Sequence, residues 1–175
     1  MKKTILTVAT LALLFTACNN ATKNEETATQ ESTPTESTES TESATPADAG
    51  SIATVAISGG DDMKFDKTEI LVKEGQTVKL TLTHSGKAPV TGMGHNFVLL
   101  AAGTDATKFA AEAVAAKDND YIPASMQSDV IAHTKTIGGG ETTEIEFVAP
   151  PKGTYTFLCS FPGHAAIMKG NFIVE

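Results

Sequence analysis

The sequence lacks arginine and any basic cluster, the features with which proteins usually contact nucleic acids. Its 175 residues include no arginine, and the formal net charge is −8. The 13 lysines form no basic cluster, so the chain has no electrostatic footprint suited to a phosphate backbone. We therefore expect no nucleic-acid partner.

The chain also lacks an apolar run long enough for a comfortable membrane span, but its start resembles an export signal. A basic Met-Lys-Lys precedes the apolar residues 11–15 and then Thr16-Ala17-Cys18. A basic start, a short apolar core and a small residue before the cut are typical of signal peptides. We predict that residues 1–17 are a lipoprotein signal peptide and that Cys18 carries the lipid. Residues 15–18 resemble a bacterial lipobox, although Phe15 departs from the usual aliphatic residue of that motif. Ordinary cleavage with an incidental Cys18 is the alternative.

Apolar residues are almost absent from the following stretch, residues 18–50. Seven acidic side chains stand against one lysine, Lys23, among Thr, Ser, Ala and Pro. Such a segment cannot bury enough surface to offset its ordering entropy. We predict a disordered tether that holds the domain off a membrane and reaches at most roughly 100 Å. The protein would then be an exported, membrane-anchored lipoprotein facing the periplasm or the cell exterior.

The remaining residues, 51–175, are predicted to form one folded domain. Strict alternation over residues 77–84 places Val78, Leu80 and Leu82 on one face, which predicts a half-buried strand of an antiparallel sheet. Other strands are expected over residues 52–57, 67–73, 95–100 and 130–137, and around 145–147, 155–159 and 172–174.

One stretch departs from this strand pattern. Residues 105–117 are rich in helix formers, with Phe109 and Val114 as apolar contacts, and predict a helix of about three turns packed outside the sheets. Seven or eight short strands punctuated by Gly and Pro indicate an all-β fold. We predict a Greek-key sandwich or barrel with one external helix.

Cysteine is so scarce that Cys159 needs an explanation. If Cys18 carries lipid, Cys159 has no partner within the chain. A leftover cysteine in an exported protein indicates a reactive thiol or a metal ligand. An inert buried thiol is the alternative.

The neighbours of Cys159 favour a metal ligand. His164 and Met168 follow it with the spacing Cys-x4-His-x3-Met. Thiolate and thioether favour Cu(I), and imidazole also binds Cu(II). A trigonal blue-copper site needs one more histidine, and the candidate is His95 within Met93-Gly-His-Asn-Phe97. Met168 or His95 alone would be interpreted as a core residue, but together these residues predict a small one-copper electron carrier.

Three stretches make the resemblance to a family specific: residues 93–99, 130–135 and 159–170. Through them, residues 51–175 resemble the azurins, bacterial type 1 (blue) copper proteins of the cupredoxin family. The resemblance implies a trigonal ligand plane, a long axial contact and a carbonyl on the opposite side. His95, Cys159 and His164 would form the plane, Met168 would be the axial contact, and the opposite carbonyl would be that of Gly94.

The resemblance also implies supporting roles and a docking surface. Asn96 would tie the two ligand segments together, and the backbone N–H of Phe161 would donate to the sulfur. His164 would lie nearest the surface, within an apolar patch for transient docking. Expected partners are redox proteins such as c-type cytochromes or a terminal reductase or oxidase. The patch consists of Met63, Met93, Phe161, Pro162, Ala165 and Ala166.

The chain departs from the azurins in two absences. The usual disulfide is missing because the domain has no second cysteine, and the buried tryptophan of many members is missing, with Phe97 in a similar place. Neither change touches a ligand. His84 and His133 match histidines that are not ligands; we favour a structural role for His84 over a pH-dependent charge, and a surface position for His133.

Other functions remain as alternatives. A copper storage or delivery protein of the cell envelope would need exchangeable, Met-rich ligation, and the sequence shows no such cluster. A copper enzyme would need added ligands, often a His beside the Cys, but Leu158 and Ser160 flank Cys159. We therefore expect no enzymatic activity. Zinc could occupy the same Cys/His/His set.

Overall fold

The structure is a computed structural model that describes residues 50–175. The predicted signal peptide, Cys18 and the predicted tether up to residue 49 lie outside the described residues. Within the described part, no helix is both long and apolar enough to cross a membrane.

One sheet has three strands: β1 (Ile52–Gly59), β3 (Thr77–His84) and β6 (Thr142–Val148), in the order β1-β3-β6. β3 has the predicted bounds, because its alternating apolar residues are all buried against the core. It is antiparallel to β6 but parallel to β1, so the predicted antiparallel pairing holds on one side only.

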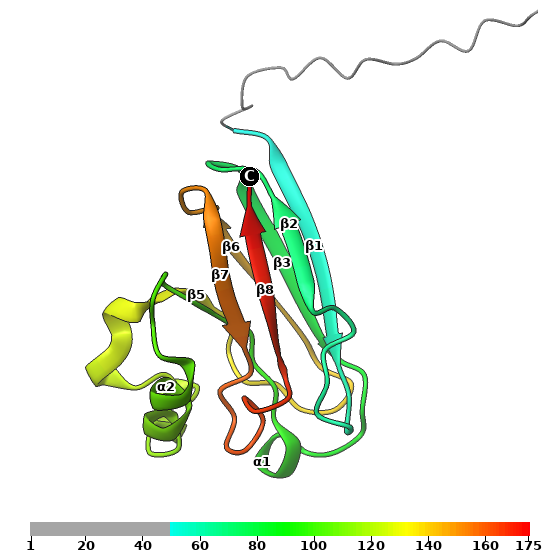
Figure 1. Cartoon of the computed structure of the whole chain (residues 1–175). Coiled ribbons are helices and arrows are strands. Elements are labelled where there is room, and N and C mark those ends of the chain that lie inside the picture. Colours follow the sequence, from blue (N-terminus) through cyan, green and yellow to red (C-terminus); the bar gives the residue numbers. More distant parts are fainter. Residues whose placement is uncertain (1–49) are drawn as a thin grey trace, which may run out of the picture. The chain divides into compact units, whose positions relative to one another are not determined.

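The other sheet has five strands in the order β2-β8-β7-β4-β5. Its strands β2, β8, β7 and β5 are labelled in Figure 1. β2 pairs in parallel with β8, and the remaining neighbours are antiparallel. Eight strands in two sheets confirm the predicted all-β class. The bounds are β2 (Glu69–Val72), β4 (Val98–Leu100), β5 (Val130–His133), β7 (Gly153–Leu158) and β8 (Lys169–Val174).

The main core is formed by the inward residues of both sheets, including Leu80, Phe97, Phe157 and Phe172, all without exposed surface. The Phe97 and Phe157 rings stack with centroids 5.3 Å apart. Full burial of such a side chain contributes about 1.5–3 kcal/mol. Phe97 thus fills the core position next to the candidate site.

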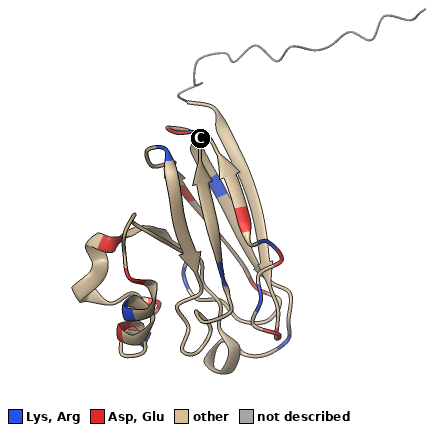
Figure 2. Ribbon diagram, viewed as in Figure 1, with Lys and Arg blue, Asp and Glu red and all other residues tan. Residues whose placement is uncertain are grey.

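A second apolar cluster lies under the helical segment. Phe109 of α2 (Ala106–Ala113) packs there against Val98, Leu158, Ile122 and other residues, so the helix covers the outside of the five-stranded sheet as predicted. α2 has about two turns instead of three, and the 3₁₀ helices η1 (Lys117–Asn119) and η2 (Ala124–Asp129) follow. Val114 is 55 % exposed, so its predicted contact is wrong. Lysines and carboxylates are interspersed over the described residues (Figure 2).

Three predicted strands are shorter in the structure. β2 covers Glu69–Val72 instead of residues 67–73. β4 begins at Val98 and not at residue 95, and β5 ends at His133 and not at residue 137. His95 and Ile137 instead form an isolated bridge, in which each N–H donates to the other's carbonyl at 2.9 and 2.8 Å. A short helix, α1 (Val90–Met93), precedes His95. The sequence did not predict this helix, because Pro89 and Gly92 indicated a loop. These irregular segments frame the candidate site.

Candidate metal centre

Three predicted ligands come together in the interior at one end of the sheets. The ligand atoms of His95, Cys159 and His164 all lie within 4.8 Å of one another. Cys159 Sγ is 3.6 Å from His164 Nδ1 and 4.0 Å from His95 Nδ1. Metal–nitrogen and metal–sulfur bonds of about 2.0 and 2.3 Å in a trigonal plane would separate nitrogen and sulfur by about 3.7 Å. The three donors therefore fit a single ion.

The other two predicted ligands lie beside this cluster. The Gly94 carbonyl oxygen is 2.9 Å from His95 Nδ1 and 3.9 Å from Cys159 Sγ. Met168 is fully buried. Its Cε and the His95 ring both lie against Gly59, where a Cβ would overlap the Cε. Glycine at position 59 thus lets the thioether lie close to the imidazole.

His95 is held from several sides. Its backbone pairs with Ile137, and its Nε2–H donates to the Gly60 carbonyl at 2.9 Å, which leaves Nδ1 facing the sulfur. Hydrogen bonds of this kind fix the tautomer and orientation of a ligand histidine. The sequence indicated Gly60 only as part of a turn.

His84 packs against the back of His95. The two rings stack at 4.2 Å with 10° between their planes. His84 Nδ1 accepts from the Gly86 N–H at 3.1 Å, so Nε2–H donates to the Met93 carbonyl at 2.7 Å. His84 is fully buried, which gives it the structural role that we favoured. His133 is half-buried on β5.

Asn96 joins the two ligand segments, as the resemblance implied. Its Oδ1 accepts from the Ser160 N–H at 2.8 Å, and its Nδ2 donates to Ser160 Oγ at 2.8 Å and to the Asp120 carbonyl at 2.7 Å. Sequence reasoning missed Ser160 and Asp120 as partners. The position of Ser160 directly after Cys159 was the available signal for one of them; nothing in the sequence marked Asp120.

Burial controls the protonation of the site without metal. It raises the pKa of the Cys159 thiol to about 11, although the backbone N–H groups of Asn96 and Phe161 act in the opposite direction. Burial, and then the nearby His95 and His84, lower the pKa of His164 to about 4. Burial also lowers the pKa of His95. At neutral pH the two imidazoles are therefore neutral and ready to bind, and metal binding must displace the thiol proton.

The surface over the cluster is apolar. His164 is 2 % exposed, whereas His95, Cys159 and Met168 have no exposed surface. Within the predicted patch, Ala166 is exposed and Phe161 is buried, so Phe161 supports the surface from below. Half-buried positions are held by Met63, Met93, Pro162 and Ala165.

Two exposed apolar residues belong to the same segments and were missed. Ile167 is 54 % exposed and Val90 is 39 % exposed. Ile167 lies between the inward-pointing His164 and Met168, and this spacing could have marked residues 165–167 as outward-facing.

The donor set is one thiolate, two imidazoles and one thioether, a combination that suits copper. Comparison with known proteins gives the same result. Residues 52–175 match the family of copper binding proteins described as the plastocyanin/azurin family. The azurin of Bordetella pertussis is 43 % identical over 122 residues, covering 67 % of this chain and 80 % of that protein.

Two further proteins are similar. Outer membrane protein H.8 of Neisseria gonorrhoeae is 38 % identical over 126 residues, covering 70 % of this chain and 67 % of that protein. The crystal structure of reduced auracyanin from Roseiflexus castenholzii superposes with a TM-score of 0.63 at 38 % identity, covering 70 % of this chain and 96 % of that one.

The family match extends over the whole described domain except its first two residues and includes all the cluster's donors. A single type 1 copper is the cofactor that these donors fit. The chain therefore belongs to the plastocyanin/azurin family of copper-binding proteins, and it is a blue copper electron-transfer protein.

Proposed function

We propose that the protein is an envelope electron carrier, not an enzyme, that shuttles single electrons between redox partners. The buried cluster of His95, Cys159 and His164 carries this proposal. Copper bound there supplies one-electron chemistry by alternating between Cu(I) and Cu(II). Met168 and the Gly94 carbonyl would also hold the ion, which their positions beside the cluster support.

Rigidity of the ligands favours transfer over storage. Electron exchange slows when ligands must move between oxidation states, and this chain holds each ligand in place. The Cys159 N–H donates to the Met168 carbonyl at 2.9 Å, and the Met168 N–H donates to the His164 carbonyl at 2.8 Å. Three ligands thus share one hydrogen-bonded loop. A protein that stores or delivers copper would need ligands that release the ion more easily.

The apolar surface around His164 is the proposed docking site. It combines Met63, Met93, Pro162, Ala165 and Ala166 with Ile167 and Val90, and Phe161 lies beneath it. An exposed apolar patch of this kind suits small, short-lived interfaces. A partner docked there would bring its cofactor close to the imidazole edge of His164. C-type cytochromes or a terminal reductase or oxidase are the partners that we propose.

We also propose that the protein is an exported lipoprotein attached through Cys18. The signal-like start and the acidic residues 18–50 support this location. A relative named an outer membrane protein supports it further. Mass spectrometry of the membrane fraction, comparing wild type with Cys18→Ser, should find diacylglycerol on the wild-type N-terminus alone.

Visible absorption and EPR spectra of the copper-loaded protein test the electron-transfer function. We expect an intense blue charge-transfer band and narrow copper hyperfine splitting, reversible on reduction. Cys159→Ala should abolish both, whereas His133→Ala, outside the cluster, should retain them. A pale spectrum with wide splitting in the wild type would contradict the proposal and favour copper storage.

A further inference from the structure

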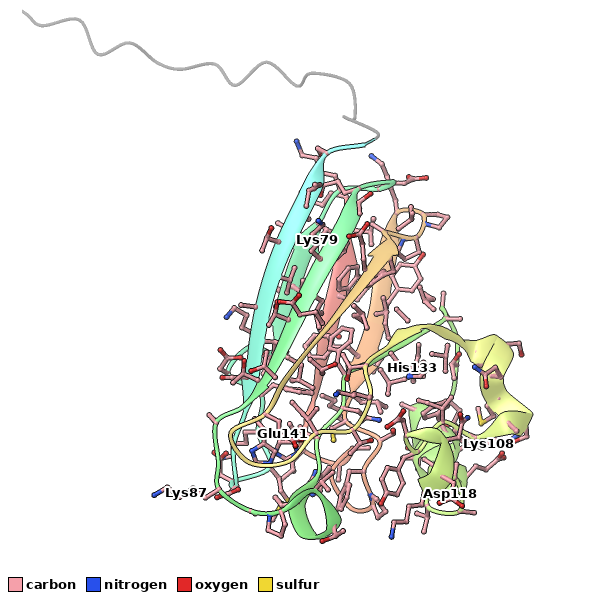
Figure 3. All side chains as sticks on the ribbon, turned by 180° about the vertical axis from the view of Figure 1, so that it is seen from behind. Lys79, Lys87, Lys108, Asp118, His133 and Glu141 are labelled. Atoms are coloured by element: carbon pink, nitrogen blue, oxygen red, sulfur yellow. The ribbon has the colours of Figure 1, made fainter. Side chains whose placement is uncertain are left out.

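Two adjacent residues with left-handed backbone conformation end the first part of the helical segment. Asp120 has φ 50° and Tyr121 has φ 59°. Asp tolerates this region, but a bulky side chain there is an outlier and persists only where its surroundings hold it. The Tyr121 N–H donates to the Ala116 carbonyl at 2.9 Å, which ties the pair to the residues after α2. Lys108 and Asp118 mark the position of this segment in Figure 3.

The pair contacts the metal centre at three points. The Asp120 carbonyl accepts from Asn96 Nδ2, and Asp120 Oδ1 accepts from the Thr136 N–H, both at 2.7 Å. The Tyr121 ring packs edge-on against Phe161, with centroids 5.1 Å apart.

Each contacted residue is next to a ligand or to a residue that holds one. Asn96 follows His95, and Thr136 precedes Ile137, whose backbone bridges to His95. Phe161 lies between Cys159 and His164 in sequence, and its ring centroid is 4.7 Å from that of His164. The pair therefore reaches both ligand-bearing segments.

We propose that Asp120 and Tyr121 form a clamp of positioning residues, by which the helical segment sets the surroundings of the copper-binding sulfur. The proposal rests on the proposed function because it concerns the same copper site. Neither residue is a ligand. The clamp acts through Asn96 and Phe161, whose backbone N–H groups also act on the Cys159 sulfur.

The hydrogen bonds of Asn96 explain how the clamp acts. Asn96 is fully buried and its amide has two N–H groups, one used by the Asp120 carbonyl and the other by Ser160 Oγ. If that carbonyl turned away, a buried N–H would lose its partner, which is unfavourable. The amide would rotate to regain one, and its bond from the Ser160 N–H would be disturbed. Because Ser160 follows Cys159 directly, the sulfur would be displaced with it.

Three substitutions at Asp120 separate the parts of this contact. Asp120→Asn keeps a side-chain acceptor for Thr136 and tolerates the left-handed backbone. Asp120→Gly keeps the backbone and its carbonyl but removes the side-chain acceptor. Asp120→Ala removes the acceptor and disfavours the conformation as well.

Amide hydrogen exchange of the full chain without copper is the first measurement. The Ser160 and Thr136 amides report on the two contacts, and the Leu80 amide in β3 reports on global opening. Relative to Leu80, we expect Asp120→Ala to speed exchange at both sites at least tenfold. Asp120→Gly should do so at Thr136 alone, and Asp120→Asn at neither. After copper loading, only Asp120→Ala should shift the charge-transfer band.

Faster exchange at Thr136 alone in Asp120→Ala, with Ser160 and the band unchanged, would overturn the proposal. The pair would then only close the helical segment. A wild type without a blue band would refute the proposed function. Amide hydrogen exchange in the copper-free chain would still show whether the clamp exists.

Tyr121 gives a test that does not depend on the folding of Asp120→Ala. Tyr121→Gly relieves the backbone strain and deletes the ring, and Tyr121→Phe keeps the ring as the matched control. The His164 N–H donates to the Phe161 carbonyl at 3.0 Å and reports on the ligand loop. We expect at least tenfold faster exchange there in Tyr121→Gly and no change in Tyr121→Phe. Unchanged exchange in both would refute this arm of the clamp.

Discussion

Gly59 ends β1 directly against two side chains of the copper site. A Cβ at this position would overlap the terminal methyl of Met168 and would lie 3.0 Å from His95 Cδ2. The methyl is the far end of a flexible side chain, so it can move aside more easily than the ring, which the Gly60 carbonyl and His84 hold. The position of the thioether therefore depends on a residue that is not a ligand.

We predict that Gly59→Ala displaces Met168 and alters the copper spectrum. Overpacking should lower the free energy of unfolding by about 1 kcal/mol, at the low end of its usual cost because the methionine can yield. Urea unfolding and EPR measure the two effects. Gly92→Ala is the control, because its Cβ would meet only Pro89, at 4.0 Å. Unchanged EPR spectra in both variants would show that Met168 is not a copper contact.

The depressed pKa of His164 makes the copper-free protein sensitive to acid. The folded chain keeps His164 neutral down to about pH 4, whereas the unfolded chain protonates it near 6.5. Between these values the unfolded state binds more protons, so acid favours unfolding, and below both values the loss is complete.

We therefore predict that the copper-free protein loses about 2–3 kcal/mol of stability through His164 between pH 6.5 and pH 4. Urea unfolding across this window measures the loss. His164→Asn should reduce the pH dependence of the unfolding free energy. An equal loss in wild type and His164→Asn would contradict the assignment to His164.

At the scale of elements, α2 begins with a side-chain cap. Asp105 Oδ1 accepts from the N–H groups of Thr107 and Lys108, at 2.9 and 3.0 Å. We predict that Asp105→Ala lowers the free energy of unfolding by about 0.5–2 kcal/mol, whereas Asp105→Ser lowers it by much less, because Ser is also a good N-cap residue. Denaturant unfolding measures the difference. Equal losses in the two variants would show that the cap does not stabilise the helix.

The elements that the sequence predicted well are those whose burial is periodic. β3 was predictable because Val78, Leu80 and Leu82 alternate and all face one core. The His95, Cys159 and His164 cluster was predictable because its spacing resembles one family. Apolar patterns could not reveal where strands stop, because long-range polar contacts decide this. β5 ends where the Thr134 hydroxyl accepts a hydrogen bond from the Phe97 N–H, and Ile137 then pairs with His95.

Polar contacts of distant residues were equally hidden. The Asp120 carbonyl meets Asn96 from 24 residues away, through a backbone conformation that no composition signal indicates. The Gly59-Gly60 pair indicated a turn. Its contacts with Met168 and His95 could not be predicted, because they depend on which segments the fold places opposite the turn. Predictions from sequence thus located the ligands and missed much of what holds them.

At the scale of the whole molecule, two exposed apolar residues allow a test of the proposed docking surface. Ile167 in the ligand loop is 54 % exposed, and Leu71 on the edge strand β2 is 58 % exposed. We predict that Ile167→Glu slows electron transfer to a c-type cytochrome at least tenfold, because a desolvated charge would oppose docking. Stopped-flow kinetics measure the rate, with Leu71→Glu as the matched control. Equal slowing by both variants would contradict a localised docking surface.

The direction of β1 has a consequence for the protein's range of action. β1 begins at Ile52, and seven residues later, roughly 23 Å along the strand, Gly59 lies against Met168 and His95. If residues 18–50 are the proposed tether, it joins the domain at the end of β1 remote from the copper site. A flexible chain of this length has an average span of about 30 Å, and such linkers confine a protein at local concentrations on the order of millimolar. Weak docking would then be sufficient, since a partner within this volume is met repeatedly without tight binding.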